Sequence, residues 1–423
     1  MNAVMGVDLQ AMGMAARRAF RAMGLVDGRR RAAAVQALAD ALVAAEGEIV
    51  AANAADVQAA AAAGLSAALV DRLTLNAARL AGLVADVRAL AELPDPVGEA
   101  YDHRTLPNGV RVHRRRVPLG VLGVIYESRP NVTIDIAALV VKTGNAAILR
   151  GGKETLNTNR VLVGVIQRAL AAHYLNPAVV QFIDSADRAL MAEMLRLNDY
   201  IDVIIPRGGA GLHQFCRENS TIPVITGGIG VCHLYFDASA DLEKSLPVIF
   251  NGRVQRPSVC NSLDTLLVHE QVAATVLPRV VDYLSAAGVT FRAEPRALAV
   301  VGSLPGVLPA GPEDFDTEWM RLVLGLKVVD GLDEAIEHIN THSMGHSDGI
   351  LTETPEHAAA FVAEVDSSAV FVNASTRFND GGQLGLGAEV AVSTQRLHAR
   401  GPMGLPELTT YKWVVEGDYT VRG

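Results

Sequence analysis

The sequence has few cysteines and no long apolar run. Only 3 of its 423 residues are cysteines, Cys216, Cys232 and Cys260, and none belongs to a CxxC pair. Cysteines this sparse argue against a disulfide framework and against a cysteine zinc site. No apolar run approaches the roughly 18 to 20 residues of a membrane span, and the N-terminal stretch lacks the apolar block of a secretory signal. We therefore expect a cytoplasmic protein with reduced thiols and no membrane partner.

An excess of positive charge is also missing. Lysine and arginine number 37 against 46 aspartates and glutamates, which gives a formal net charge of -9 and a pI near 5.7. A general nucleic-acid binder needs excess basic side chains on one face to displace counterions from phosphate. The one basic run, "RVHRRRV" at 111–117, alternates with apolar residues and is more typical of the solvent-facing side of a strand. We predict no nucleic-acid partner.

A full GxGxxG fingerprint is absent, so a bound dinucleotide would not use the standard phosphate turn. Glycine clusters stand instead near residues 144, 150, 207 and 227, each after an apolar run typical of a buried strand. Each cluster taken singly is more typical of a strand-to-helix turn. Four of them at strand ends favour a nucleotide-binding crevice.

The composition that remains is that of an ordinary folded protein. The chain is 50% hydrophobic and 20% charged, and its length predicts two or three domains. Residues 9 to about 92 are rich in alanine and leucine at helical spacing and predict several helices. We expect Ser66 to cap the helical run 66–93.

Beyond the helices the pattern changes to alternating strands and helices. Residues 104–118 predict a β-hairpin that turns at Asn108-Gly109. Short buried-strand runs then alternate with helical patterns, including a strand expected in "IPVITGGIG" at 222–230, and this order predicts a doubly wound α/β sheet. A second α/β unit is expected from about 238, and the C-terminal "LTTYKWVVEGDYTVRG" predicts strand, turn, strand.

Three histidines, His338, His342 and His346, are spaced so that they would share one face of a helix. Polar residues and a glycine between them break the helical pattern, and no carboxylate or cysteine completes a ligand set. We expect no metal.

The three cysteines differ in their settings. Cys216 lies in a helical pattern and Cys232 in an apolar run, so both are predicted to be packed thiols. Cys260 instead follows Arg253 and Arg256 in a polar stretch and precedes an apolar strand pattern. A cationic, partly exposed environment is what makes a thiol a usable nucleophile. These residues alone leave a catalytic role and a packing role open.

Over nearly its whole length the chain resembles the aldehyde dehydrogenase superfamily, and within it the family that reduces L-glutamyl 5-phosphate. This resemblance implies an aldehyde dehydrogenase-like α/β fold, with two doubly wound α/β domains and a small β oligomerisation element. The stretches that carry it are "GVIYESRPNVT", "KTGNAAILRGGKE", "IPRGGAGLHQFCREN", "IPVITGGIGVCH", "NGRVQRPSVCNSLDTLLV", "MGHSDGILTE" and "STQRLHARGPMGLPELTTYKW".

The resemblance also implies a domain layout and an assembly. A homo-oligomer, dimer or tetramer, is expected through the β element, and an association with glutamate 5-kinase is left open. The implied parts are a cofactor-binding domain at 1–103 and 119–237 that includes the N-terminal helices, a catalytic domain at 238–372 that carries the cysteine, the β element at 104–118 and 405–423, and a returning segment at 373–404.

Roles for individual residues follow from the same resemblance. Cys260 takes the place of the catalytic thiol, and Asn131 that of the asparagine that helps hold the oxyanion. Where NAD-preferring relatives place a glutamate that binds the ribose 2′-hydroxyl, this chain has Lys153, which would attract a 2′-phosphate, so NADPH is the expected cofactor. The cofactor-binding residues implied are Arg150, Lys153, Gly208, Gly209 and Glu318.

One further departure from the superfamily bears on the reaction. Hydrolytic members carry a glutamate before the paired glycines to activate water, and Ile225 stands there instead. A missing general base forfeits roughly 10²- to 10⁴-fold in rate. Water attack on a thioester should therefore be poor, which suits an enzyme that passes an acyl group between phosphate and hydride.

The reaction implied is NADPH-dependent reduction of L-glutamyl 5-phosphate to L-glutamate 5-semialdehyde and phosphate through a cysteine thioester, the second step of proline biosynthesis. Arg129, Arg256 and Arg377 are candidates to bind the substrate's phosphate or α-carboxylate by bidentate contacts, and structural salt bridges are equally open for them. Two other functions stay open: reduction of an acyl-CoA, and a non-catalytic subunit that organises the kinase.

Overall fold

The computed structural model describes residues 7–227 and 230–422, except for the side chains of 67 and 68. The chain divides into two compact units. The first comprises the described parts of Met1–Thr226, Gly385–Ala391 and Met403–Gly423, and the second comprises those of Gly227–Leu384 and Val392–Pro402.

The first unit contains a four-stranded parallel sheet in the order β5-β4-β3-β6. Every residue of β3 is buried, as expected for a parallel strand covered on both faces. Side chains of α1, α8 and α9 form one core cluster with β3, β4 and β6. The strands are β3 (Val121–Tyr126), β4 (Ala146–Arg150), β5 (Val180–Phe182) and β6 (Val203–Arg207).

The predicted N-terminal helices are confirmed, with one break that the sequence analysis missed. The Ser66 hydroxyl caps α4, as expected. However, the run 66–93 is divided, because Asn76 caps a second helix by accepting a hydrogen bond from the Arg79 N–H. The helices of this unit are α1 (Leu9–Met23), α2 (Gly28–Ala44), α3 (Glu46–Ala62), α4 (Ala67–Leu73), α5 (Ala77–Glu92), α6 (Asn131–Thr143), α7 (Leu156–Ala172), α8 (Ala189–Met194) and α9 (Ala210–Asn219).

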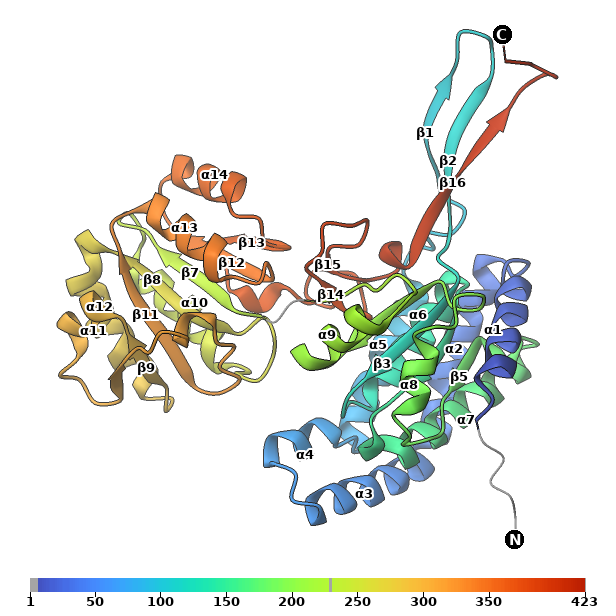
Figure 1. Cartoon of the computed structure of the whole chain (residues 1–423), viewed down its shortest axis with the longest axis horizontal. Helices are drawn as coiled ribbons and strands as arrows, with labels where there is room; N and C mark the ends of the chain where they lie inside the picture. The colour runs from blue at the N-terminus through green and yellow to red at the C-terminus, as the bar shows by residue number, and fades with distance from the viewer. Residues whose placement is uncertain (1–6, 228–229, 423) are drawn as a thin grey trace. The chain divides into compact units, whose positions relative to one another are not determined.

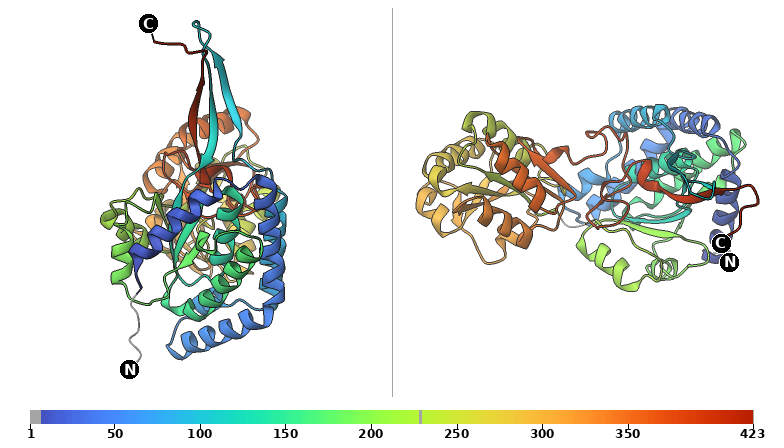
Figure 2. Two further views of the ribbon diagram at one scale, coloured as in Figure 1. Left: turned by 90° about the vertical axis from the view of Figure 1, so that its right-hand side faces the viewer. Right: turned by 90° about the horizontal axis from the view of Figure 1, so that it is seen from above.

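A separate antiparallel sheet projects from the helices of the first unit (Figures 1 and 2). It consists of β1 (Ala100–Thr105), β2 (Arg111–Pro118) and β16 (Thr409–Glu416), in the order β1-β2-β16. The predicted hairpin is therefore present, but its first strand begins at Ala100 rather than at residue 104. Gly109 has a φ of 83° in the turn, a value that glycine adopts without strain.

The second unit contains a seven-stranded parallel sheet in the order β10-β9-β11-β8-β7-β12-β13. Alternate residues of its central strands face two core clusters: Leu234 and Leu266 belong to one, Tyr235 and Leu267 to the other. The predicted fold class, with two doubly wound α/β sheets, is confirmed. The strands are β7 (Cys232–Phe236), β8 (Leu263–His269), β9 (Thr290–Ala293), β10 (Val307–Pro309), β11 (Val323–Val329), β12 (Ser347–Leu351) and β13 (Ala369–Val372).

Helices cover both faces of this second sheet, since residues of α10 and α11 join one core cluster and those of α13 and α14 join the other. Within residues 7–227 and 230–422, no helix is both long and apolar enough to cross a membrane. The remaining α-helices and strands are α10 (Leu242–Val254), α11 (Glu270–Ser285), α12 (Pro295–Val301), α13 (Leu332–His342), α14 (Pro355–Glu364), β14 (Val392–Ser393) and β15 (Gly401–Pro402).

Two predicted strands are wrong. Residues 222–227 form no strand and make only one bridge, between Val224 and Ile204. Pro223 has no N–H to donate to a ladder, which limits the pairing; residues 228–229 of this prediction lie outside the described residues. At the C-terminus, β16 pairs with β2 along its whole length, but the described residues 417–422 form no second strand.

Candidate active site

Cys260 lies in the turn between the end of α10 and the start of β8. It is partly exposed. Its backbone carbonyl accepts a hydrogen bond from the Cys232 thiol, with Sγ and O 3.1 Å apart. A Cβ at Gly230 would stand only 1.5 Å from the same carbonyl oxygen, so position 230 requires glycine. The backbone of Cys260 is thus held by close contacts while its side chain remains accessible.

The other two cysteines are buried, as predicted. Burial raises the pKa of the Cys216 thiol to about 11. Burial, and next the charges of Asp264 and Asp348, raise the pKa of Cys232 well above its usual value. Both thiols therefore stay protonated near neutral pH, and Cys232 is kept in the form that can donate to the Cys260 carbonyl.

Arg253 is buried, whereas the sequence suggested that it contributes to a cationic, partly exposed setting for Cys260. It is fully buried and pairs with Asp264 at 2.8 Å, instead of lining an open cationic surface. Its guanidinium also donates to the carbonyls of Leu263 and Pro257, at 2.7 and 2.8 Å. These two carbonyls flank Cys260 in the chain, so Arg253 holds both ends of the cysteine loop. Sequence reasoning missed this role because nothing in the sequence identifies Asp264 as its partner.

Two of the proposed anion-binding arginines, Arg256 and Arg377, belong to the second unit. Arg256 lies in the cysteine loop itself, and Arg377 interacts electrostatically with Cys260. Arg377 lies in a short 3₁₀ helix, Thr376–Phe378, and its Nε donates to Gln255 Oε1 at 3.1 Å. Burial lowers the pKa of Arg377, whereas the charges of Asp380 and Cys260 act to raise it. The exposed Arg256 also acts on it electrostatically.

Glu318 lies in the loop before β11 and is partly buried. Its charge is among those that raise the pKa of Cys232. The next residue, Trp319, donates its backbone N–H to Asp264 Oδ1 at 3.2 Å, which ties this loop to β8. In the second unit, Glu318 is thus within electrostatic reach of Cys232, and Arg377 is within reach of both Cys232 and Cys260.

The remaining predicted residues belong to the first unit and gather at one edge of its sheet. The strands β4, β3 and β6 are adjacent and parallel, so the residues that follow them emerge at their common carboxyl edge. Arg129 and Asn131 follow β3, Arg150 ends β4 and Lys153 follows it, and Gly208 and Gly209 follow β6.

Asn131 is the first residue of α6, and its Nδ2 donates to Asp135 Oδ2 at 3.1 Å. Burial raises the pKa of Asp135 to about 7, against the effect of the Asn131 hydrogen bond, which lowers it. The sequence analysis did not identify Asp135. A signal was available, because residues four apart on a helix are neighbours.

Arg150 and Lys153 provide the positive charge at the end of β4. Burial, and next the charge of Arg188, lower the pKa of the Arg150 guanidinium. Its Nε is buried and has no hydrogen-bond partner among the described residues, which is costly unless a ligand or water completes it. Lys153 is exposed. The chemistry of this donor pair fits an anionic ligand.

The glycines after β6 lie against a carboxylate that sequence reasoning also missed. The Gly209 N–H donates to Glu127 Oε2 at 3.1 Å, and a Cβ at Gly208 would stand 2.4 Å from that oxygen. Position 208 thus accommodates only glycine while Glu127 lies there. The available signal was a carboxylate directly after the buried strand β3.

Ile225 is buried, and its backbone N–H donates to the Ile204 carbonyl of β6 at 2.9 Å. Its side chain has no group that can accept a proton. The histidines have structural contacts: the rings of His338 and His342, both on α13, lie 4.3 Å apart. In the part of the chain that is described, no group of three or more His, Cys, Asp or Glu side chains could hold a metal ion.

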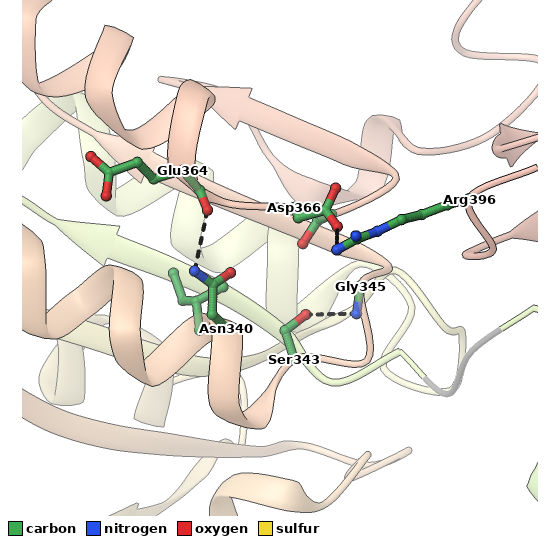
Figure 3. Close-up of a pocket in the computed structure, with 8 residues that line it drawn as sticks. Asn340, Ser343, Gly345, Glu364, Asp366 and Arg396 are labelled. Carbon is green, nitrogen blue, oxygen red and sulfur yellow. Dashed lines mark hydrogen bonds and ion pairs between the residues drawn. The ribbon is translucent and has the colours of Figure 1, made fainter.

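A separate polar cavity of about 420 Å³ lies in the second unit (Figure 3). Several of its lining groups bond to one another. Asn340 donates to the Glu364 carbonyl at 3.2 Å, and Arg396 pairs with Asp366. None of its lining residues is one that the sequence proposed for catalysis or binding.

Comparison with known proteins agrees with the fold and the sequence motifs. The sequence model of the aldehyde dehydrogenase family matches residues 3–297. The gamma-glutamyl phosphate reductase of Roseiflexus castenholzii is 59% identical over 421 residues, which cover 98% of this chain and 99% of that protein. The one of Aeromonas salmonicida is 57% identical over 415 residues, 98% of this chain and 100% of that protein.

Comparison with solved structures indicates the same family and fold. The crystal structure of gamma-glutamyl phosphate reductase from Thermotoga maritima has a TM-score of 0.95 at 45% identity, covering 99% of this chain and 100% of that one. An acetylating aldehyde dehydrogenase from Geobacillus thermoglucosidasius, 18% identical with a TM-score of 0.70 over 98% and 97% of the two chains, shares the fold. The chain therefore belongs to the aldehyde dehydrogenase family, among the gamma-glutamyl phosphate reductases.

Proposed function

We propose that this chain reduces L-glutamyl 5-phosphate to L-glutamate 5-semialdehyde and phosphate with NADPH, in proline biosynthesis in the cytoplasm. The names of its relatives support the substrate. The single observation that carries the mechanism is the setting of Cys260. It is the partly exposed thiol of the three cysteines, and its charge interacts with that of Arg377.

In the first step the Cys260 thiolate attacks the acyl carbon. A neighbouring guanidinium favours the thiolate, which is the nucleophilic form of cysteine. A carbon–sulfur bond forms, the bond from carbon to the phosphate oxygen breaks, and phosphate leaves with the electron pair. The family resemblance assigns Asn131 the role of stabilising the oxyanion that develops in this step, and the product is a thioester on Cys260.

The anionic groups of the substrate require cationic partners. Arg129, Arg256 and Arg377 are the proposed ones, because a guanidinium binds phosphate or carboxylate through two parallel hydrogen bonds. Among them Arg377 has the most support, since it is both half-buried and electrostatically linked to Cys260. Its present hydrogen bond to Gln255 would fix the direction of the guanidinium.

NADPH, when bound, supplies the hydride that reduces the thioester to the aldehyde. The residues proposed to hold it are Arg150, Lys153, Gly208, Gly209 and Glu318. The buried, unpartnered Nε of Arg150 and the exposed ammonium of Lys153 fit the adenosine ribose and its 2′-phosphate. A carboxylate at position 153 would repel that phosphate.

The chain lacks the general base that hydrolytic relatives use to activate water against the thioester. Ile225, a buried apolar side chain, stands where hydrolytic relatives carry a base. Without a base to activate water, hydrolysis is slow and the acyl group passes to hydride or back to phosphate.

We also propose a homo-oligomer, a dimer or a tetramer, assembled through the β1-β2-β16 sheet. Tyr411, Trp413 and Val415 are exposed large side chains on β16, and exposed apolar side chains gathered on one strand favour an interface. Light scattering should show more than one chain per particle. An association with glutamate 5-kinase would be detected as a second, larger particle in a mixture.

The reverse reaction tests the proposal. Purified protein should reduce NADP+ with L-glutamate 5-semialdehyde only when inorganic phosphate is present, and Cys260→Ala should abolish this activity. The buried Cys216 provides the control, since Cys216→Ala should retain it. Equal turnover without phosphate would contradict the role of Ile225. Turnover that requires coenzyme A in place of phosphate would instead show an acyl-CoA reductase, and no turnover at all would favour a non-catalytic partner of the kinase.

A further inference from the structure

The helix α6 contains, one turn after Asn131, a carboxylate that the proposed reaction does not yet use. Asp135 is partly buried and accepts a hydrogen bond from Nδ2 of Asn131 at 3.1 Å. Asn131 itself begins the helix, and Pro130 before it offers no side-chain cap. The side chain of Asn131 is therefore oriented by Asp135 and not by the usual helix-end contacts.

We propose that Asp135 is a positioning residue that fixes the direction of the Asn131 amide, so that its NH₂ end keeps the single orientation that the proposed oxyanion role requires. This inference rests on the proposed function. The physical reason is that an ionised and a protonated carboxyl differ in whether they can donate a hydrogen bond. An ionised carboxylate only accepts hydrogen bonds, so it must face the NH₂ end of the amide. A protonated carboxyl can also donate, and then the amide can turn its oxygen toward Asp135 and lose its catalytic direction.

Burial places this change of protonation near neutral pH, and the charges around Asp135 modify it. Burial raises the pKa of Asp135 to about 7. Arg207 at the end of β6 acts to lower the pKa, whereas Asp86 of α5 and Glu389 of the segment Gly385–Ala391 act to raise it. The orientation of Asn131 should accordingly be fixed above pH 7 and become free as the pH falls through 7.

The test is a steady-state comparison of wild type, Asp135→Asn and Asp135→Glu across pH 5.5 to 8.5. An asparagine at 135 can present either end to Asn131 and no longer selects one orientation. We expect kcat of Asp135→Asn at pH 8 to fall by roughly 10- to 100-fold, within the range of a weakened oxyanion donor, with KM for the acyl phosphate changed less than about threefold. The wild-type kcat should fall toward that of the variant at pH 5.5, and Asp135→Glu should restore part of the loss.

Two further variants separate positioning from a general electrostatic effect. Asp86→Asn removes an exposed charge that acts to raise the pKa of Asp135, and its kcat should stay within about twofold of wild type. In the Asn131→Ala background, Asp135→Asn should cost nothing more, because a residue that acts through another is silent once that other is removed.

The possible outcomes distinguish a failure of the positioning role of Asp135 from a failure of the proposed function. If wild type turns over but Asp135→Asn matches it at every pH, or if the two losses multiply in the double variant, Asp135 has no positioning role and the proposed function still stands. If wild type does not turn over acyl phosphate at all, the proposed function fails first. Tight NADPH binding by Asp135→Asn, measured by fluorescence, confirms that the variant is folded.

Discussion

The two units hold their proposed site residues in different ways. In the second unit, the loop of Cys260 is fixed by a buried network: Arg253 binds both of its flanks, and Gly230 allows the backbone to pack closely. In the first unit, Lys153 and Gly208 are exposed at the ends of strands. The residue that would form and break bonds is therefore held rigidly, whereas residues that would bind a mobile cofactor lie where a ligand can enter.

The largest effect should follow from Cys260→Ala. Removal of the nucleophile should lower NADP+ reduction by at least roughly 10⁴-fold, while Cys216→Ala, which alters a thiol of raised pKa, should lower it less than about fivefold. The measurement is initial rate at saturating phosphate. Comparable losses in the two variants would remove the distinction between an accessible thiol and a packed one.

Arg253→Met tests whether the buried network holds the second unit. The substitution leaves Asp264 buried without its partner, and breaking such a pair costs about 3–5 kcal/mol. The exposed pair Arg279–Glu243 provides the control, because Arg279→Met should cost less than about 1 kcal/mol. Denaturant unfolding of both variants gives the comparison. A small loss for Arg253→Met would mean that the cysteine loop does not depend on this network.

In the first unit, the partly buried Asp135 carboxyl should make the free energy of unfolding depend on pH. The pKa of Asp135 rises from 3.8 to about 7 on folding, so the folded state binds the proton more tightly. The stability this proton confers is complete below pH 3.8 and is lost as the pH rises to 7. Asp135→Asn should therefore gain about 2–3 kcal/mol relative to wild type between pH 5 and pH 8. Asp86→Asn should show no such trend, and parallel unfolding curves for all three proteins would contradict the assigned shift.

The smallest effect is expected at the exposed Lys153. Lys153→Glu should lower the preference for NADPH over NADH by about tenfold, because an exposed charge acts through solvent. The ratio of kcat/KM for the two cofactors is the measurement, and Lys412→Glu on β16 is a control of equal charge change. An unchanged ratio would show that Lys153 does not recognise the 2′-phosphate.

Much of the fold could be predicted because buried parallel strands are continuous apolar runs. The runs at β3 and β4 identified both strands, and the Asn108-Gly109 pair identified the turn of the hairpin. The strand expected at 222–230 failed because the apolar pattern does not reveal that Pro223 cannot donate to a ladder. The break at Asn76 was missed because helical spacing continues across it.

Some residues of the candidate site could also be identified from the sequence, whereas others could not. Cys260 could be singled out because a polar, proline-containing loop stood between a helix and a strand. The structural role of Arg253 could not, since its partner Asp264 is apparent only after folding. Asp135 could have been found from its spacing to Asn131, but its pKa also depends on charges in α5, at the end of β6 and at Glu389, which are distant in sequence.

The most direct test of the central claim is to trap the acyl group on the enzyme. The protein would be incubated with L-glutamate 5-semialdehyde and NADP+ without phosphate, digested, and analysed by mass spectrometry, followed by addition of phosphate to a parallel sample. The account predicts a glutamyl adduct on the peptide that contains Cys260, long-lived without phosphate and rapidly lost with it. An adduct on another residue, or one that decays equally fast without phosphate, would contradict it.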